Sequence, residues 1–236
     1  MTNVSRVIAV MNQTHDVGKT FITANLADAL HRQGKSVLVL DMDPQADLTR
    51  SFDVPSSQFG VSAWLRGERS FEQVSRSLRD GLTLIPADTA LTQFDQQTET
   101  KRQFGNRLST LLPHYAGQYD LVLLDCAAIS GLLGSNAVLA ASDMLLPVTG
   151  DATALQGMLD MLPVIRRVSL HRHKALRVWL CLNRLPRGSD YADKLTAMMR
   201  SYFPKRLLQT VIYEADTAQT TVYQSLAQDL LAGRTA

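Results

Sequence analysis

Gly18, Lys19 and Thr20 are the first residues of the chain whose types and spacing suit chemistry on a phosphate. They follow a short apolar run, and a segment with helical spacing begins directly after them. In a strand–loop–helix unit of this kind, N–H groups at the helix start face an anion, a lysine reaches the β- and γ-phosphates, and a hydroxyl holds Mg²⁺. Gln13 stands where the usual pattern has its first glycine. The pattern predicts a nucleotide-binding loop made of Thr14, His15, Asp16, Val17, Gly18, Lys19, Thr20 and Phe21.

Carboxylates follow two other apolar runs. Asp41 and Asp43 end the run at 37–40, and Asp125 ends the run at 121–124. In open α/β sheets, ligands bind at the carboxyl ends of the strands, where carboxylates can hold Mg²⁺ through water or orient an attacking water. We therefore predict Thr20, Asp41 and Asp125 as metal-side residues, and Lys19 and Asp43 as catalytic residues. A polar strand end followed by a proline turn is the structural alternative for Asp41 and Asp43.

The elements that would position these residues alternate along the whole chain. Continuous apolar runs predict buried strands at 7–11, 37–40, 82–85, 121–124, 144–148, 178–182 and 208–212, with helical spacing between most of them. This alternation predicts an α/β fold with a doubly wound, mostly parallel sheet flanked by helices, in a single domain over 1–236. The stretch 52–103 is less regular. Helix-like pieces at 61–65 and 71–78 and a polar run at 97–102 suggest a solvated loop or an insertion there.

Composition and charge narrow the class of protein. The 236 residues are 45% hydrophobic and 19% charged, and no apolar run is long enough to cross a bilayer. We see no signal peptide, and Cys126 and Cys181 lie inside apolar runs, so we expect a soluble cytoplasmic protein with buried thiols. The net charge is only +2, yet 161–206 holds eleven Lys or Arg against two Asp. Such asymmetry indicates an anionic partner.

These stretches together resemble the ParA/MinD family of deviant-Walker P-loop ATPases, and most of all its short ParA-type partition members. The resemblance rests on 12–20, 37–45, 119–125, 131–136, 141–148, 154–157 and 210–212, and so covers most of the chain. It implies ATP and Mg²⁺ as cofactors, a homodimer, non-specific DNA binding, and a ParB-like or adaptor protein that stimulates hydrolysis. It also implies that Lys19 is the P-loop lysine, that Asp43 positions the attacking water, and that Asn183 lies near the adenine.

The chain departs from the family pattern at the loop. Family members usually have Lys-Gly-Gly where this chain has Thr14, His15 and Asp16, and that first lysine reaches the partner's phosphates across the dimer. Losing a cation that neutralises charge on the transferring phosphate can cost orders of magnitude in rate. Another basic residue could replace it, as in McdA relatives that position carboxysomes, and Arg184, Arg187 and His15 are the candidates. The alternatives are very slow hydrolysis or a non-hydrolysing nucleotide-binding scaffold.

Two further expectations follow from the resemblance. The family's DNA surface lies in its C-terminal half, so we predict Arg166, Arg167, Arg200, Lys205 and Arg206 as DNA-binding residues of a nucleoid-associated protein. The last segment, 221–236, has a single basic residue and predicts a packed helix rather than a membrane anchor. Ala127 and Ala128 stand where relatives often have prolines. A small-molecule ligase on the same fold is a third class, and it would need a substrate pocket.

Overall fold

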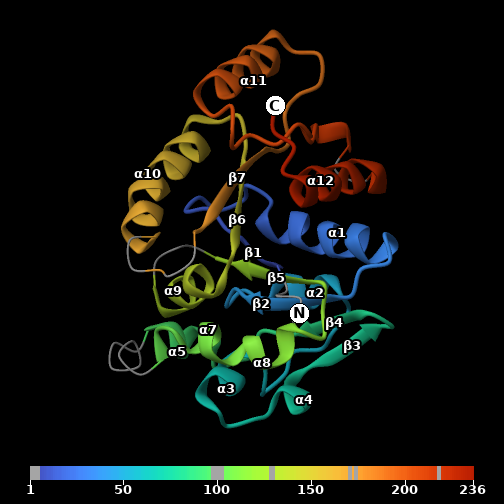
Figure 1. Cartoon of the computed structure of the whole chain (residues 1–236), viewed down its shortest axis with the longest axis vertical. Coiled ribbons are helices and arrows are strands. Elements are labelled where there is room, and N and C mark those ends of the chain that lie inside the picture. The colour runs from blue at the N-terminus through green and yellow to red at the C-terminus, as the bar shows by residue number, and fades with distance from the viewer. Residues whose placement is uncertain (1–5, 97–103, 128–130, 170–171, 173–174, 217–218) are drawn as a thin grey trace.

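A seven-stranded sheet runs through the computed structural model, which describes residues 6–96, 104–127, 131–169, 172, 175–216 and 219–236 (Figure 1). The strand order is β3-β4-β2-β5-β1-β6-β7, and all neighbours pair in parallel except β3 with β4. The strands are β1 (Arg6–Val10), β2 (Val37–Met42), β3 (Arg76–Arg79), β4 (Leu82–Ile85), β5 (Leu121–Cys126), β6 (Asp143–Val148) and β7 (Arg177–Leu182). The predicted doubly wound, mostly parallel fold is confirmed.

Helices cover both faces of the sheet. One face packs against α1 (Lys19–Arg32), α2 (Asp47–Ser51) and α12 (Thr220–Ala232), and α12 lies beside α1 (Figure 1). The other face packs against helices from the middle and the C-terminal half of the chain. These are α3 (Val61–Arg66), α4 (Phe71–Val74), α5 (Leu91–Gln96), α7 (Arg107–Leu111), α9 (Gly131–Ala140), α10 (Ala152–Ser169) and α11 (Asp190–Tyr202). Two short elements complete the set, α8 (Pro113–Ala116) and the 3₁₀ turn η1 (Glu214–Asp216).

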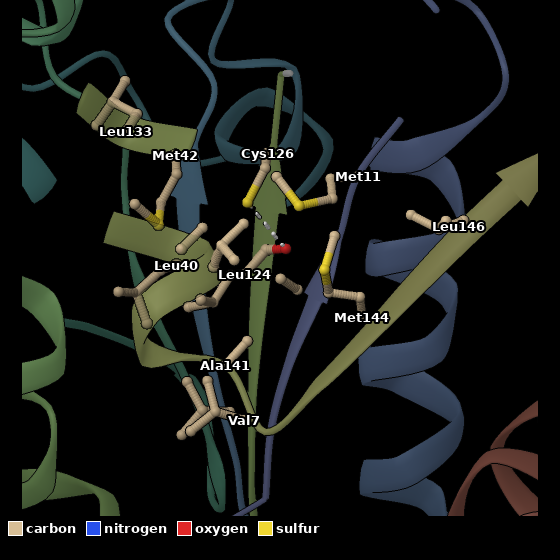
Figure 2. Close-up of a cluster of buried hydrophobic side chains, with 14 of the residues drawn as sticks. Val7, Met11, Leu40, Met42, Leu124, Cys126, Leu133, Ala141, Met144 and Leu146 are labelled. Atoms are coloured by element: carbon tan, nitrogen blue, oxygen red, sulfur yellow. Dashed lines mark hydrogen bonds between the residues drawn. The ribbon is translucent and has the colours of Figure 1, made fainter. Parts of the chain in front are cut away.

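The core explains why the strands read as unbroken apolar runs. Alternate residues of each central strand face opposite layers, so both sides of the strand need apolar side chains. On β1, for example, Ile8 packs with α1 and α12, while Ala9 packs with the opposite helices. Figure 2 shows part of the core on the face of the sheet that α9 and α10 cover, where Met11, Met144 and Cys126 belong to one buried cluster. Both cysteines, Cys126 and Cys181, are free and buried, as predicted.

Two sequence predictions were wrong. The run 208–212 is no regular strand: it follows the edge of β7 through isolated bridges, including Leu180 with Leu207 and Leu185 with Tyr213. Its buried Leu208 and Ile212 gave it the apolar pattern of a strand, but only isolated bridges join this part of the chain to the sheet. The piece 71–78 is a helix only to Val74, and β3 follows it antiparallel to β4. The predicted helix at 61–65 is confirmed as α3, and the polar run 97–102 lies outside the described residues.

The order of the strands indicates where a ligand would bind, at the carboxyl ends of the central strands. β1 lies between β5 and β6, and the chain leaves it toward β2 on one side and reaches β6 and β7 on the other. Ligands of doubly wound folds bind at the carboxyl ends of the strands, at such a switch point. The loop after β1 occupies this position. Among the described helices, none is long and apolar enough to span a membrane.

Candidate nucleotide site

The loop between β1 and α1 has the conformation that an anion cradle needs. Gly18 precedes the helix with φ of +87°, in the left-handed region that favours glycine. A Cβ at this position would lie 2.4 Å from Nδ2 of Asn183, so a side chain would also collide with the neighbouring loop. Asp16 adopts a positive φ of 58° at a position where the family has glycine. The first N–H groups of the helix, which a helix cannot satisfy from within, therefore follow a tightly turned loop.

Lys19 lies across this loop. Its side chain is buried, and Nζ donates a hydrogen bond of 2.8 Å to the Thr14 carbonyl. Burial lowers the pKa of Lys19, while the Asp43 and Asp125 carboxylates oppose that shift. A lysine held over the loop in this way is poised to exchange a carbonyl for a phosphate oxygen.

Asp125, like Asp41, is a fully buried carboxylate of the site. Oδ1 accepts a hydrogen bond of 3.3 Å from the Thr23 hydroxyl, which also donates to the Lys19 carbonyl at 2.9 Å. Oδ2 is buried and has no hydrogen-bond partner among the described residues. Burial, reinforced by the Asp41 carboxylate, raises the pKa of Asp125 to about 8, although the Thr20 hydroxyl opposes the shift. A buried carboxylate oxygen in this condition fits a site that is completed by a cation.

Asp41 pairs with Asp125 across the β2–β5 ladder but has its own partners. Thr49 donates to Asp41 Oδ2 from both its N–H, at 2.8 Å, and its hydroxyl, at 2.6 Å, and the Asp43 N–H donates to Oδ1 at 3.2 Å. Burial raises the pKa of Asp41 to about 6, and the Thr49 hydrogen bonds counteract this. In the structure Asp41 thus holds the segment that carries Asp43, which is half-buried and accepts from the Gln45 N–H.

The two residues after β7 hold the phosphate loop from the side. Asn183 donates from Nδ2 to the Val17 carbonyl at 2.8 Å, and its Oδ1 is buried without a partner in the described part of the chain. Arg184 has a positive φ of 54°, and its guanidinium donates to the Asp16 carbonyl at 2.9 Å. Arg187, the other arginine considered as a replacement cation, instead pairs with Asp216 and stacks 4.6 Å over the Tyr213 ring.

Thr14, at the position of the family's first loop lysine, contacts α10 of the same chain. Its hydroxyl donates to the Thr153 carbonyl of α10 at 3.2 Å, and the N–H of Gln13 meets Sδ of Met161 at 3.1 Å. His15 and Asp16 are exposed at the tip of the loop, and Phe21 is 42% exposed beside Tyr223. The loop therefore rests on α10 on one side and on Asn183 and Arg184 on the other.

The five basic residues predicted to contact DNA are all exposed. Arg166 and Arg167, from the last turn of α10, and Arg206, from the turn after α11, line one surface hollow of about 960 Å³. The other residues that line the hollow are apolar and include Leu162 and Val178. Lys205 adjoins Arg206, and Arg200 lies in the last turn of α11, outside the lining of the hollow.

Sequence reasoning missed three residues that build the site. Thr23 and Thr49 hydrogen-bond Asp125 and Asp41, and the missing side chain of Gly157 leaves the space that Thr14 occupies beside α10. Gly157 alone left a signal, because a single glycine inside a helical pattern often marks a close approach. Thr49 has no such signal in the sequence, because it reaches Asp41 only after the chain turns back on itself.

The residues present fit a Mg²⁺–nucleotide. The orphaned Asp125 oxygen, the nearby Thr20 hydroxyl and the buried Lys19 form the donor set for a metal and for phosphates. Among the described residues, no three His, Cys, Asp or Glu side chains cluster to hold a metal ion by themselves. Proteins usually hold Mg²⁺ with one or two oxygens of their own together with substrate phosphates.

Comparison with known proteins identifies the family. A family model described as an AAA domain matches residues 5–178. The chromosome-partitioning ATPase Soj of Thermus thermophilus is 33% identical over 208 residues, which cover 88% of this chain and 80% of Soj.

Solved structures show the same fold. A Mycobacterium smegmatis protein described as cobyrinic acid a,c-diamide synthase, with bound ATP analogue and magnesium, is 26% identical with a TM-score of 0.88, covering 97% of this chain and 95% of its own. Two more distant structures share the fold alone. A plasmid partition protein from Borrelia burgdorferi is 20% identical with a TM-score of 0.83, and the match covers 97% of this chain and 98% of that one. An ATP complex of Cyanothece McdA is 15% identical with a TM-score of 0.83, and the match covers 99% of this chain and 98% of that one. With these matches and the loop geometry described above, the chain belongs to the ParA/MinD family of P-loop ATPases.

Proposed function

We propose that this protein is an ATP-dependent dimerisation switch that binds DNA without sequence preference and uses it as a matrix to partition or position a cargo. ATP and Mg²⁺ would build a homodimer that is competent for DNA. A ParB-like or adaptor protein would then trigger hydrolysis and release. The cargo would be a plasmid, an integrated element or a chromosome region, and the protein would act on the nucleoid in the cytoplasm.

The observation that carries the proposal is the gathering of arginines at one end of α10. Arg166, Arg167 and Arg206 come from segments that are distant in the sequence and line the same hollow. Guanidinium groups that neutralise backbone phosphates release counterions, which gives binding that depends on salt and ignores sequence. Lys205 and Arg200 would extend this surface.

The nucleotide end of the switch is assigned to the loop and the strand ends around it. Lys19 would bind the β- and γ-phosphates, Thr20 and Asp125 would hold Mg²⁺, and Asn183 would face the adenine. The bound Mg²⁺ would neutralise charge on the phosphates. Asp43, fixed by its neighbour Asp41, would orient the attacking water. Arg184 is the better placed replacement for the missing lysine, because it already touches the loop, whereas Arg187 is engaged by Asp216.

The test is DNA binding by the purified protein to an arbitrary duplex, with ATP, ADP or no nucleotide, at two salt concentrations. We expect binding only with ATP, weakened by salt and abolished by Lys19→Ala. The matched control is Lys35→Ala, at a partly exposed lysine between α1 and β2 whose loss leaves the loop intact. Binding that ignores nucleotide, or no binding at all, would refute the switch.

A scaffold that binds ATP without hydrolysing it is the second candidate. It is favoured by Thr14, which lacks the positive charge of the family lysine and bonds to its own α10. Retention of unhydrolysed ATP in the presence of DNA and partner would support it, while turnover would support the switch. The likeness to McdA suggests a variant of the first proposal, in which the cargo is a protein assembly instead of DNA. The nucleotide site and the DNA surface would be the same in both.

A further inference from the structure

Helix α10 touches the phosphate loop near its start and carries arginines at its end. The Thr153 carbonyl, in its first turn, accepts from the Thr14 hydroxyl, and Met161 lies against the N–H of Gln13. Arg166 and Arg167 lie in its last turn. One helix therefore links the loop to the basic hollow.

Gly157 lies between these two points of α10 that meet the loop. A Cβ at this position would lie 2.1 Å from Thr14 Oγ1 and 3.3 Å from Asn12 Oδ1. Asn12 is fixed, because it donates to the Pro147 carbonyl at 2.7 Å and accepts from the Thr14 N–H at 2.9 Å. Alanine is the better helix former, so the close approach of the loop, and not helix stability, is what requires glycine here.

We propose that the contact between Thr14 and Gly157 is a joint that couples occupancy of the phosphate loop to the arginine end of α10. Phosphates would bind the N–H groups of the loop that contains Thr14. A change in the loop's conformation on binding would then reach α10 through this joint. Pro163 lies inside α10 between the loop contacts and the arginines, but the helix continues past it to Ser169. A shift of its first turns is therefore carried through one continuous helix to Arg166 and Arg167. The inference rests on the proposed function and names how ATP reaches the DNA surface inside one protomer.

The key variant is Gly157→Ala, which adds one methyl group to the joint. The measurement is the affinity for an arbitrary DNA duplex with and without Mg-ATP. We expect ATP to tighten DNA binding by the native protein at least about tenfold, a factor within the usual range of allosteric coupling, and to change the affinity of the variant very little. Gln156→Ala is the matched control. It raises helix propensity at the adjacent exposed position, where Gln156 bonds only forward to Asp160 among the described contacts, and should keep the native ratio.

A double-mutant cycle separates the joint from general damage. Thr14→Ala removes the hydroxyl that the added methyl would meet, so in that background Gly157→Ala should cause no further loss of coupling. Thr14→Val removes the hydroxyl without adding bulk and should also weaken the effect of ATP on DNA affinity. This variant keeps the proposal testable if Gly157→Ala does not fold. A native ATP effect in Gly157→Ala or, should that variant not fold, in Thr14→Val would overturn the proposal.

Failure of the proposed function is distinguishable from failure of the joint. If native DNA binding ignores ATP, the switch is refuted, and the joint is then read from hydrogen exchange along α10. Slower exchange on adding Mg-ATP to the native protein, absent in Gly157→Ala, would still support the coupling. No effect of ATP on α10 in the native protein would overturn it.

Discussion

Asp125 is a buried carboxylate whose negative charge is unfavourable until Mg²⁺–nucleotide binds beside it. Its pKa is raised to about 8, so the folded protein holds a proton there that the unfolded chain releases near pH 4. Unfolding therefore releases a proton between these values, and the free energy of unfolding falls as the pH rises through that window. Asp125→Asn removes this loss.

We predict that the nucleotide-free Asp125→Asn variant melts at a higher temperature than the native protein at pH 8, and that the difference shrinks toward pH 5. Thermal unfolding across this pH range provides the measurement. The same variant should lose the stabilisation that Mg-ATP gives the native protein. Equal pH dependence in both proteins would contradict the assignment of the buried proton to Asp125.

Arg184 combines a strained backbone with a hydrogen bond to the loop, and the two can be separated. Arg184→Ala removes the guanidinium from the Asp16 carbonyl and should weaken ATP binding about tenfold, since hydrogen bonds from charged groups contribute about 1.5–3 kcal/mol. Arg184→Gly should weaken binding equally but raise the melting temperature, because glycine tolerates a φ of 54°. Calorimetric titration and thermal unfolding measure the two effects. Arg187→Ala serves as the control, and an equal loss of affinity there would argue against a special role for Arg184.

At the residue scale, the sequence predicted the loop and the carboxylates well, but not their partners. Lys19 could be recognised because it begins a helix directly after a Gly-Lys-Thr loop. Asp125 could be recognised because it follows the apolar run of a buried strand. The hydrogen bonds from Thr49 to Asp41 and from Thr14 to Thr153 join residues whose pairing depends on the tertiary fold. No local spacing encodes such pairs.

At the scale of elements, a buried charge cluster ties together strand starts at the end of the sheet opposite the loop. Arg6 of β1 and Arg177 and Trp179 of β7 all donate to the fully buried Asp143 of β6. Burial alone would raise the pKa of Asp143, but hydrogen bonds from Arg6 and Trp179 hold it below its ordinary value. Its contribution to stability is therefore complete at neutral pH and is lost as the pH falls through the lowered pKa.

Asp143→Ala should reduce the free energy of unfolding by about 3–5 kcal/mol at pH 7, because it leaves the Arg6 side chain, which is only 15% exposed, without that carboxylate. Urea denaturation at pH 7 and at pH 3 provides the measurement, and the difference from the native protein should be smaller at the lower pH. Asp160→Ala, at an exposed position on α10, is the control. A loss below about 1 kcal/mol at pH 7, as ordinary surface changes give, would contradict a stabilising role for the cluster.

The two wrong predictions at this scale have opposite physical causes. Leu207, Leu208 and Ile212 are as buried as strand residues, but they pack beside β7 through isolated bridges. Burial sets the apolar pattern, while hydrogen-bond geometry decides whether a strand forms. The edge strand β3 escaped prediction for the opposite reason, because its half-exposed Arg-Ser-Leu-Arg sequence has almost no apolar signal.

For the whole molecule, the asymmetric charge predicts how the proposed binding to DNA responds to salt. Replacing Arg166, Arg167 and Arg206 together by Gln should reduce the slope of log affinity against log salt by about 3, one for each DNA phosphate that is no longer neutralised. Binding titrations at several salt concentrations measure the slope. The control is a triple change of the same charge at Arg32, Arg50 and Arg79, which make ion pairs on other surfaces. An equal change of slope in both variants would reflect net charge and not a local DNA surface.

The burial of both thiols gives the protein a chemically silent background for labelling. Cys126 and Cys181 are the complete cysteine complement, and each is covered by the core. Burial also raises the pKa of each thiol, so the reactive thiolate is scarce. A cysteine introduced at exposed Gln156 would be the one thiol that a bulky maleimide dye reaches in the folded protein. A fluorophore there would report in real time whether α10 responds when nucleotide enters the loop.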